Sequence, residues 1–263
     1  MSNLKNESEF FHSIAPLVIS LVRDSSKEMA VVADKGAGDY ATQVDVDVEN
    51  LVVAELGKVF PGDQILAEEG YSDTSIGEGR IWLIDPICGT SNLGKGINNF
   101  CTNIALVEGN QVVASCVVDH SQGEYFWSVG GGQVFVGDRE HQLPAPELGL
   151  KIDVDFGAVR SVAGDVRQKH NNTLLKIIND TEYDVISLNA SLGFAYAAIG
   201  KTDGFINVYN HPWDIAAASF LVQQVGGVVT GIDGSPWTPE TIGAIGGRTS
   251  EIHKELLDLF LSS

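Results

Sequence analysis

The alternation of apolar and polar positions along this 263-residue chain predicts two N-terminal helices followed by short strands. Apolar side chains recur at three- and four-residue steps over residues 10–22, which places them on one face of a helix. A second helical pattern covers residues 48–59 and ends at the Pro61-Gly62 pair, because these residues do not continue a helix readily. The stretch KGAGDYATQ, residues 35–43, is predicted to be a loop.

Beyond Pro61 the pattern changes to short runs rich in β-branched residues, which are typical of strands. These runs cover residues 64–67, 81–84, 102–107, 111–118 and 124–129. A short Gly/Asn turn at residues 108–110 separates two of them and predicts a hairpin. We therefore expect the first half of the chain to form two helices on an antiparallel sheet.

The second half alternates between strand-like and helical patterns. The segment QLPAPELG, residues 142–149, contains two prolines and a glycine and is the best candidate boundary, so we divide the chain into residues 1–145 and 146–263. After the boundary, strand-like runs cover residues 158–162 and 183–187, and helical patterns cover residues 168–178, 191–199, 215–225 and 250–261. This alternation predicts an α/β second half.

Composition narrows the class of protein. A hydrophobic fraction of 44% and a mean hydropathy of +0.07 fit a soluble globular chain. The net charge of −19, from 16 basic and 35 acidic residues, disfavours nucleic acid and anionic membranes as partners. A solvated acidic surface accounts for such a charge, and a metal site is a second use for part of it.

Three cysteines, Cys88, Cys101 and Cys116, argue against a framework of disulfides and for a reducing compartment. The opening MSNLKNESEFFHS lacks the pattern of a secretory signal, and no run approaches the roughly 18 apolar residues of a spanning helix. We therefore expect a cytoplasmic protein.

The segment WLIDPICGTSN, residues 82–92, carries the clearest candidate chemistry. Asp85 stands where a buried strand ends, and Pro86 makes the chain turn sharply. Gly89 permits the close approach of another group, and a helical turn that begins at Thr90 would offer free N–H groups to an anion. A cation held by acids beside an anion-binding turn suits a phosphate ester. An ordinary Asp-Pro turn with a structural glycine is the alternative interpretation.

Three further acids flank predicted elements. Glu68 follows a strand-like run, Asp214 precedes a helix that Gly226-Gly227 closes, and Asp45 lies ahead of the second helix. Each has an ordinary explanation, as a surface charge, a helix N-cap and a partner of the helix dipole respectively. Because hard divalent cations prefer carboxylate oxygens, these acids are also candidate ligands.

The segments DYATQVDVDVE, FPGDQILAEEG, WLIDPICGTSN and HPWDIAAASFLVQQVGG, in this order, resemble the inositol monophosphatase family of magnesium-dependent, lithium-sensitive phosphatases. The resemblance covers nearly the whole chain. It implies a layered αβαβα sandwich of the inositol monophosphatase and fructose-1,6-bisphosphatase type, and a homodimer. Residues 1–145 would form an α+β half with the metal site, and residues 146–263 an α/β half that contributes Asp214 and the substrate pocket.

The resemblance also implies a set of metal ligands. Glu68, Asp85 and the Ile87 carbonyl would hold a first Mg²⁺, while Asp85, Asp214 and position 88 would hold a second. Glu68 would also help to place a third, looser cation. Mn²⁺ is an alternative ion, and Li⁺ is expected to inhibit.

The implied catalytic groups lie nearby in the sequence. Asp45 and Thr90 would orient the attacking water that the metals activate. The Gly89 and Thr90 amides would bind the phosphate group. The implied reaction is the hydrolysis of a small phosphate monoester.

Cys88 departs from the family pattern Asp-Pro-Ile/Leu-Asp-Gly-Thr, in which its place belongs to a second aspartate. Mg²⁺ binds thiolates poorly, so the cysteine removes a charge and an oxygen ligand. Reduced or lost activity, retention of the first metal alone, a softer metal such as Zn²⁺ or Mn²⁺, and a redox switch at the thiol remain open. Cys101 and Cys116 are expected to be plain buried thiols.

Four residues are candidates for substrate contact by their place relative to the family motifs. Asn207 stands where the family often has a glutamate, Asn189 and Ala190 fall where members line the pocket, and His211 precedes Asp214 by three residues. Inositol monophosphate is the default substrate; sugar phosphates, fructose bisphosphate and a nucleotide 3′-phosphate remain open. The competing function is a catalytically silent homologue that binds a phosphate ligand or regulates.

Overall fold

The computed structural model describes residues 4–25, 30–36, 39–71, 75–145 and 149–263. Parts of two predicted segments therefore lie outside the described residues. These are residues 146–148 of the predicted boundary and residues 37–38 of the predicted loop.

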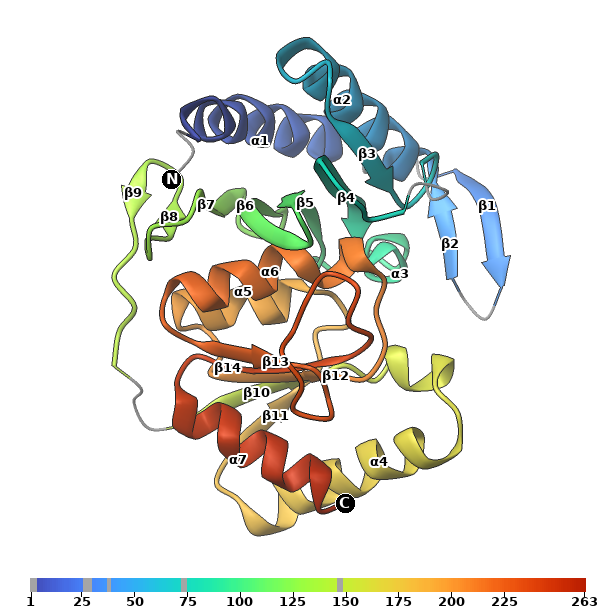
Figure 1. Cartoon of the computed structure of the whole chain (residues 1–263). Helices are drawn as coiled ribbons and strands as arrows, with labels where there is room; N and C mark the ends of the chain where they lie inside the picture. The colour runs from blue at the N-terminus through green and yellow to red at the C-terminus, as the bar shows by residue number, and fades with distance from the viewer. Residues whose placement is uncertain (1–3, 26–29, 37–38, 72–74, 146–148) are drawn as a thin grey trace.

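The chain folds into five layers, which Figure 1 shows from top to bottom, and this confirms the predicted αβαβα sandwich. The outer helical layer above the large sheet holds α1 (Lys5–Ser25) and α2 (Gln43–Val59), the central layer holds α5 (Leu192–Ile199) and α6 (Pro212–Gln224), and the opposite outer layer holds α4 (Gly164–Asp180) and α7 (Ser250–Leu261). The helices predicted from the sequence periodicity are all present. No helix within the described residues is both long and apolar enough to cross a bilayer.

The large sheet lies between the first outer layer and the central helices. Its order is β3 (Gln64–Ala67), β4 (Arg80–Cys88), β5 (Cys101–Glu108), β6 (Gln111–Asp119), β7 (Glu124–Ser128), β8 (Phe135–Val136) and β9 (Arg139–Glu140). The predicted hairpin is confirmed, because Glu108 pairs with Gln111 across the turn. The prediction of an antiparallel sheet holds except at β3, which runs parallel to β4.

The small sheet lies between the central helices and the second outer layer. Its order is β11 (Asp184–Ile186), β10 (Lys151–Val154), β12 (Gly204–Asn207), β14 (Ala244–Gly247) and β13 (Val228–Thr230). Strand β10 is parallel to both of its neighbours, and the other pairs are antiparallel. The predicted run at residues 183–187 corresponds to β11, whereas β12, β13 and β14 have only three or four residues each and are too short to produce a clear period-two pattern.

Two predictions of local structure are wrong. Residues Ala158–Ser161 form a 3-10 helix rather than a strand, and the strand of this region is β10, seven residues earlier, where the buried Asp153 interrupts the apolar pattern. The predicted loop at residues 35–43 contains part of an antiparallel pair, β1 (Val31–Gly36) and β2 (Asp39–Thr42). Backbone hydrogen bonds define that pair, and its register shifts leave no regular alternation to detect.

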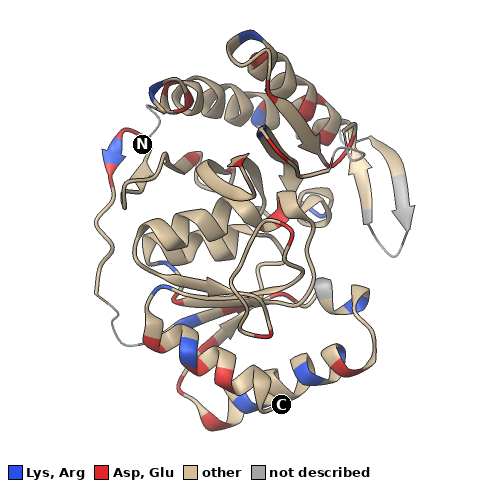
Figure 2. Cartoon of the chain, in the orientation of Figure 1, with Lys and Arg blue, Asp and Glu red and all other residues tan. Residues whose placement is uncertain are grey.

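The central helices pack against both sheets through small side chains. Ala195, Ala198, Ala216 and Ala217 are fully buried there, and alanine loses no side-chain rotamer entropy when it is buried. Figure 2 shows α5 and α6 in tan over nearly their whole length, while acidic and basic residues lie mainly on the outer helices and loops. The middle of the molecule is therefore apolar, and any charge placed there needs a specific reason.

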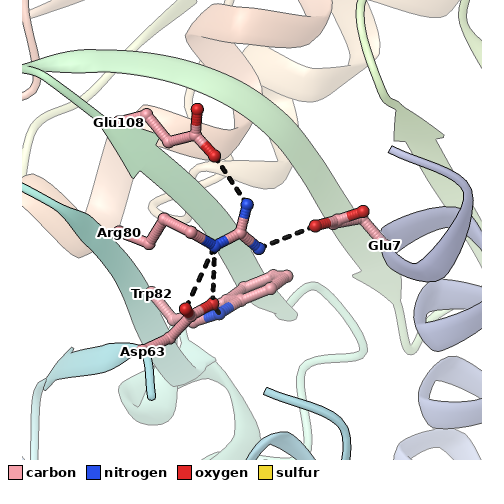
Figure 3. A network of polar contacts seen from close by, with 5 residues as sticks. All are labelled: Glu7, Asp63, Arg80, Trp82 and Glu108. Carbon is pink, nitrogen blue, oxygen red and sulfur yellow. Dashed lines mark hydrogen bonds and ion pairs between the residues drawn. The ribbon is translucent and has the colours of Figure 1, made fainter. Parts of the chain in front are cut away.

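A network of charges around Arg80 fixes the outer helical layer to the large sheet, as Figure 3 shows. The Arg80 guanidinium donates to Glu7 on α1 at 2.6 Å, to Glu108 on β5 at 2.6 Å and to both oxygens of Asp63 at 3.0 Å. The Trp82 indole donates to the same Asp63 carboxylate at 2.8 Å. One cation therefore joins three segments that are far apart in the sequence.

Replacement of Arg80 by alanine is expected to lower the free energy of unfolding by about 2–3 kcal/mol, because three carboxylates would lose their shared cation in a site that is only partly exposed. Urea unfolding measures the change. The control is Lys58→Ala, which removes the exposed pair with Glu55 and is expected to cost less than about 1 kcal/mol. Equal losses in the two variants would contradict a structural role for the network.

Candidate functional site

A pocket of about 510 Å³ opens where the end of β4, the start of α6 and the loop before α5 meet. Its volume is that of an ordinary small-molecule site. The residues predicted from the sequence that line it are Glu68, Asp85, Ile87, Cys88, Gly89, Thr90, Asn189, Ala190, Asn207, His211 and Asp214. The remaining predicted residue, Asp45, lies directly behind Thr90. The fold thus brings the whole predicted set together.

Asp85 is buried at the end of β4, 1% exposed. Its Oδ1 atom has no hydrogen-bond partner among the described residues, and its Oδ2 atom lies 3.5 Å from the Asn103 amide. Burial raises the pKa of the Asp85 carboxyl well above its ordinary value, and Cys88, Glu68 and Asp214 raise it further. A buried acid beside other acids is stabilised either by a proton or by a cation.

The residues around Asp85 fit one divalent cation. Ala67 pairs with Ile84, so Glu68 stands level with Asp85 in the parallel ladder of β3 and β4. Within the described part of the chain, no three His, Cys, Asp or Glu side chains form a ready-made metal cage. Mg²⁺ does not require one, since it is commonly held by one or two carboxylates together with waters and substrate phosphate. The unpartnered Asp85 oxygen and Glu68 are sufficient for such a site.

Position 88 does not fit a second Mg²⁺. The Cys88 sulfur accepts a hydrogen bond from the Ser191 N–H at 3.2 Å. A hydrogen bond with Cys101, together with burial, raises the pKa of the Cys88 thiol well above its ordinary value. A neutral thiol offers a hard cation neither the charge nor the oxygen of a carboxylate.

The turn after Cys88 has the shape that only glycine permits. Gly89 has a φ of 98°, and a Cβ atom there would lie 3.1 Å from the Ala190 Cβ and 3.2 Å from the Asn99 carbonyl oxygen. Gly89 is the N-cap of α3 (Thr90–Gly94). The first N–H groups of a helix have no partner within the helix, so the turn presents donors beside Asp85.

Thr90 and Asp45 form a hydrogen-bonded pair at the wall of the pocket. The Thr90 hydroxyl lies 2.9 Å from Asp45 Oδ1 and 2.8 Å from the Ile87 carbonyl oxygen, and its single hydrogen serves one of these acceptors at a time. Burial raises the pKa of the Asp45 carboxyl, while hydrogen bonds from Thr42 and Thr90 oppose that shift. The pair can hold a water molecule by accepting one of its hydrogens.

Asp214 takes a different place from the one predicted. It is the third residue of α6 rather than the N-cap, and its Oδ2 atom accepts from the backbone N–H of the true N-cap, His211, at 2.6 Å. Asp45 occupies the same position on α2, where it accepts from the Thr42 N–H at 2.9 Å. The correction has a simple cause, since the capping box places the acid three residues inside the helix.

The His211 ring is exposed and stacks on Trp213 at a centroid distance of 4.8 Å. On the opposite side of the pocket, the Asn207 amide donates to Asp155 Oδ2 at 3.0 Å and accepts from the Tyr209 N–H at 3.1 Å. Asn207 is therefore already engaged within the protein, and the carboxylate of this wall belongs to Asp155.

Sequence reasoning missed Asp155, Phe156, Arg160 and Tyr209, which line the same pocket. They follow the ends of β10 and β12, and the position of β10 was predicted wrongly. A correct assignment of that strand would have drawn attention to the Asp-Phe-Gly segment that follows it.

Asn103 is a second residue that the sequence analysis missed. It is buried on β5, opposite Asp85 in the register, and its amide lies 2.7 Å from the Ser191 hydroxyl and 3.1 Å from the Asp214 carbonyl oxygen. One side chain thus joins β4, α5 and α6 at the pocket floor. An asparagine inside an otherwise apolar strand was the available signal.

The loop before α5 is held from behind by Asp153 on β10. Asp153 Oδ1 accepts from the Leu188 N–H at 2.9 Å, and the side chain is 1% exposed. Burial raises the pKa of Asp153 to about 7. The protonation of this residue is therefore coupled to the loop that carries Asn189 and Ala190.

Comparison with known proteins gives a consistent result. The model of the inositol monophosphatase family matches residues 5–263. An inositol-1-monophosphatase of Mesorhizobium japonicum is 34% identical over 82% of this chain and 81% of its own length, and a Nus factor SuhB of Xylella fastidiosa is 31% identical over 82% and 78%. A crystal structure of an IMPase/NADP phosphatase with bound Mg²⁺ and phosphate superposes with a TM-score of 0.83 at 21% identity, covering 98% of this chain and 96% of that one.

The pKa of Asp153 predicts a pH-dependent stability difference. Its value in the unfolded chain is about 3.9, so the folded state binds more protons between about pH 4 and pH 7 and the wild type loses stability as pH rises through this window. The variant Asp153→Asn retains an acceptor for Leu188 and does not titrate. Its stability relative to wild type is expected to increase by about 2–3 kcal/mol from pH 5 to pH 8.

Urea unfolding at several pH values measures this difference. The matched control is the exposed Asp184→Asn on the neighbouring strand β11, measured at the same pH values. Parallel curves for wild type and Asp153→Asn would show that Asp153 titrates normally.

Proposed function

This chain belongs to the inositol monophosphatase family, and on that premise we propose that it hydrolyses a small phosphate monoester with the help of a divalent cation. The observation that carries the proposal is the unpartnered, buried Asp85 oxygen beside the Gly89 turn in one pocket. A carboxylate in that position attracts a cation, and the turn attracts an anion. A phosphate ester satisfies both at once.

The first step of the proposed reaction is the placement of the phosphate group. Its oxygens accept hydrogen bonds from the backbone N–H groups of Gly89 and Thr90. Asp85, Glu68 and the Ile87 carbonyl would hold Mg²⁺ beside it. The bound cation supplies positive charge that offsets the charge of the ester and lowers the pKa of a nearby water.

The second step is the attack of water on phosphorus. Thr90 accepts a hydrogen from this water while its own hydroxyl donates to Asp45, so the lone pair of the water points toward the phosphate. The Asp45 carboxylate fixes the orientation of the hydroxyl rather than contacting the substrate. The hydrogen bonds from Thr42 and the start of α2 hold Asp45 itself in place.

The leaving alcohol would lie against the opposite wall of the pocket. The Asp155 carboxylate accepts from substrate hydroxyl groups, and Asn207 positions Asp155. Asn189, Ala190 and His211 complete this wall. Inositol monophosphate or a related sugar phosphate fits a polar wall of this kind, and the 34% identical relative is itself named an inositol-1-monophosphatase.

A second candidate function is a catalytically silent homologue that binds a phosphate ligand or regulates another process. Two observations favour it. Cys88 supplies no oxygen to a second cation, and a 31% identical relative is named a Nus factor. The turn at Gly89 and the pocket would remain useful for binding in such a protein.

Other expectations from the sequence stay predictions. One is that residues 1–145 hold the metal and residues 146–263 contribute Asp214 and the substrate pocket. The others are a homodimer, a cytoplasmic location, a second or third cation and inhibition by Li⁺. Sedimentation measures the oligomeric state, and a titration of LiCl into the assay measures the inhibition.

The variant Asp85→Asn is expected to reduce Mg²⁺-dependent phosphate release from inositol 1-phosphate by at least about 10²-fold, because the amide cannot hold the cation that offsets the charge of the ester. The far-UV circular dichroism spectrum should be unchanged. The exposed Asp184→Asn is the matched control and should retain wild-type turnover. Full turnover of the Asp85 variant would overturn the assignment of the cation site.

The variant Cys88→Asp is expected to raise Mg²⁺-dependent turnover by about tenfold or more, because it restores a carboxylate ligand for a second cation. Cys88→Ser removes the sulfur without adding a charge and should not activate the protein. Activity of the aspartate variant alone would support the silent homologue for the wild-type chain. Equal turnover of all three proteins would show that position 88 does not limit catalysis.

A further inference from the structure

Two of the three cysteines face each other across adjacent strands at the floor of the pocket. Cys88 on β4 and Cys101 on β5 are direct partners in the antiparallel register, immediately after the irregularity between Asp85 and Cys88. Directly opposed residues of an antiparallel pair have Cα atoms roughly 4.5–5.5 Å apart. This spacing lies within the roughly 4.4–6.8 Å that a disulfide requires.

The Cys88 and Cys101 side chains also contact the same residue, Ser191. The Cys88 sulfur accepts from the backbone N–H of Ser191 at 3.2 Å, and the Cys101 sulfur lies 3.4 Å from the hydroxyl of the same residue. Both sulfurs therefore lie together at the beginning of α5, and neither strand must move far to join them.

The third cysteine provides an internal comparison. Cys116 is fully buried on β6, where its register partners are Ile104 on β5 and Trp127 on β7. No thiol is opposite it in the described sheet. Only Cys88 is part-exposed and lines the pocket, so it is the thiol that a dissolved reagent reaches first.

We propose that Cys88 and Cys101 form a reversible disulfide when the protein meets a low-molecular-weight disulfide such as oxidised glutathione. The Cys88 thiol, after loss of its proton, attacks one sulfur of the reagent, which releases one molecule of reduced thiol. The Cys101 sulfur then displaces the second molecule of thiol from Cys88. In total the two cysteines are oxidised to one disulfide, and the reagent disulfide is reduced to two thiols.

The cross-link would alter the pocket directly. It joins β4 to β5 across residues 89–100, the segment that contains the Gly89 turn and α3. It also removes the Cys88 thiol as a partner for any cation or substrate group. The disulfide itself does not depend on catalysis, whereas its effect on turnover rests on the proposed phosphatase function.

The test uses the full chain incubated for hours with oxidised glutathione, because buried thiols exchange slowly. Free thiols are then alkylated under denaturing conditions and counted by mass spectrometry, with peptide mapping of any cross-link. We expect one free thiol, at Cys116, and a peptide pair that joins Cys88 to Cys101. Addition of dithiothreitol should restore three free thiols.

Two variants separate this disulfide from other oxidation. Cys116→Ser should form the same cross-link, whereas Cys101→Ser should form none and at most a glutathione adduct at Cys88. Thermal unfolding should show a midpoint several degrees higher for the oxidised wild type, reversed by dithiothreitol and absent in Cys101→Ser.

In the wild type, three free thiols after equilibration, a stable glutathione adduct at Cys88 without a cross-link, or a disulfide that includes Cys116 would each overturn the proposal. The mass measurement requires no turnover, so its outcome is independent of whether phosphate release is detected. If the cross-link forms and phosphate release is present only in the reduced protein, the disulfide regulates the proposed activity. If the cross-link forms and neither state releases phosphate, the proposal holds and the phosphatase assignment fails.

Discussion

The buried Asp85 carboxylate is the constraint on which the site depends. It lies at the end of a strand whose other residues are apolar, beside two further acids, and one of its oxygens has no hydrogen-bond partner among the described residues. A charge in that position is strongly unfavourable unless a cation or a proton neutralises it. The arrangement is therefore suited to binding a cation rather than to stabilising the fold, which distinguishes it from the network around Arg80, where the protein itself supplies the cation.

Helix capping fixes the positions of two other acids, Asp45 and Asp214. Asp45 and Asp214 each sit three residues inside a helix and accept from the N–H of the capping residue, so their carboxylates are fixed by the backbone of their own helix. The two helices belong to different layers, on opposite faces of the large sheet. The same hydrogen bonds thus stabilise the N-terminal ends of the two helices and fix the positions of the two carboxylates.

The departure from the family pattern at position 88 affects both the cation site and the packing beneath it. The sulfur of Cys88 accepts a hydrogen bond from the Ser191 N–H at the beginning of α5, in the interior of the sandwich. A carboxylate at that position would bring a charge next to Asp85 and would need a cation to offset it. The cysteine therefore makes the pocket floor more tolerant of an absent second cation, and it places a redox-active atom beside the proposed phosphate turn.

Periodicity and motif order in the sequence determined the helices, most strands of the large sheet and the pocket residues that lie at the end of β4 and the start of α6, because amphipathic faces and strand-end acids are local signals. Strands β12, β13 and β14, the true position of β10, and the roles of Asn103 and Asp155 were decided only by the tertiary structure. Strands of three or four residues owe their form to backbone pairing with neighbours, which no local pattern records. The facing of Cys88 and Cys101 depends likewise on a strand register that includes an irregularity, and one residue of shift would have sent their side chains to opposite faces of the sheet.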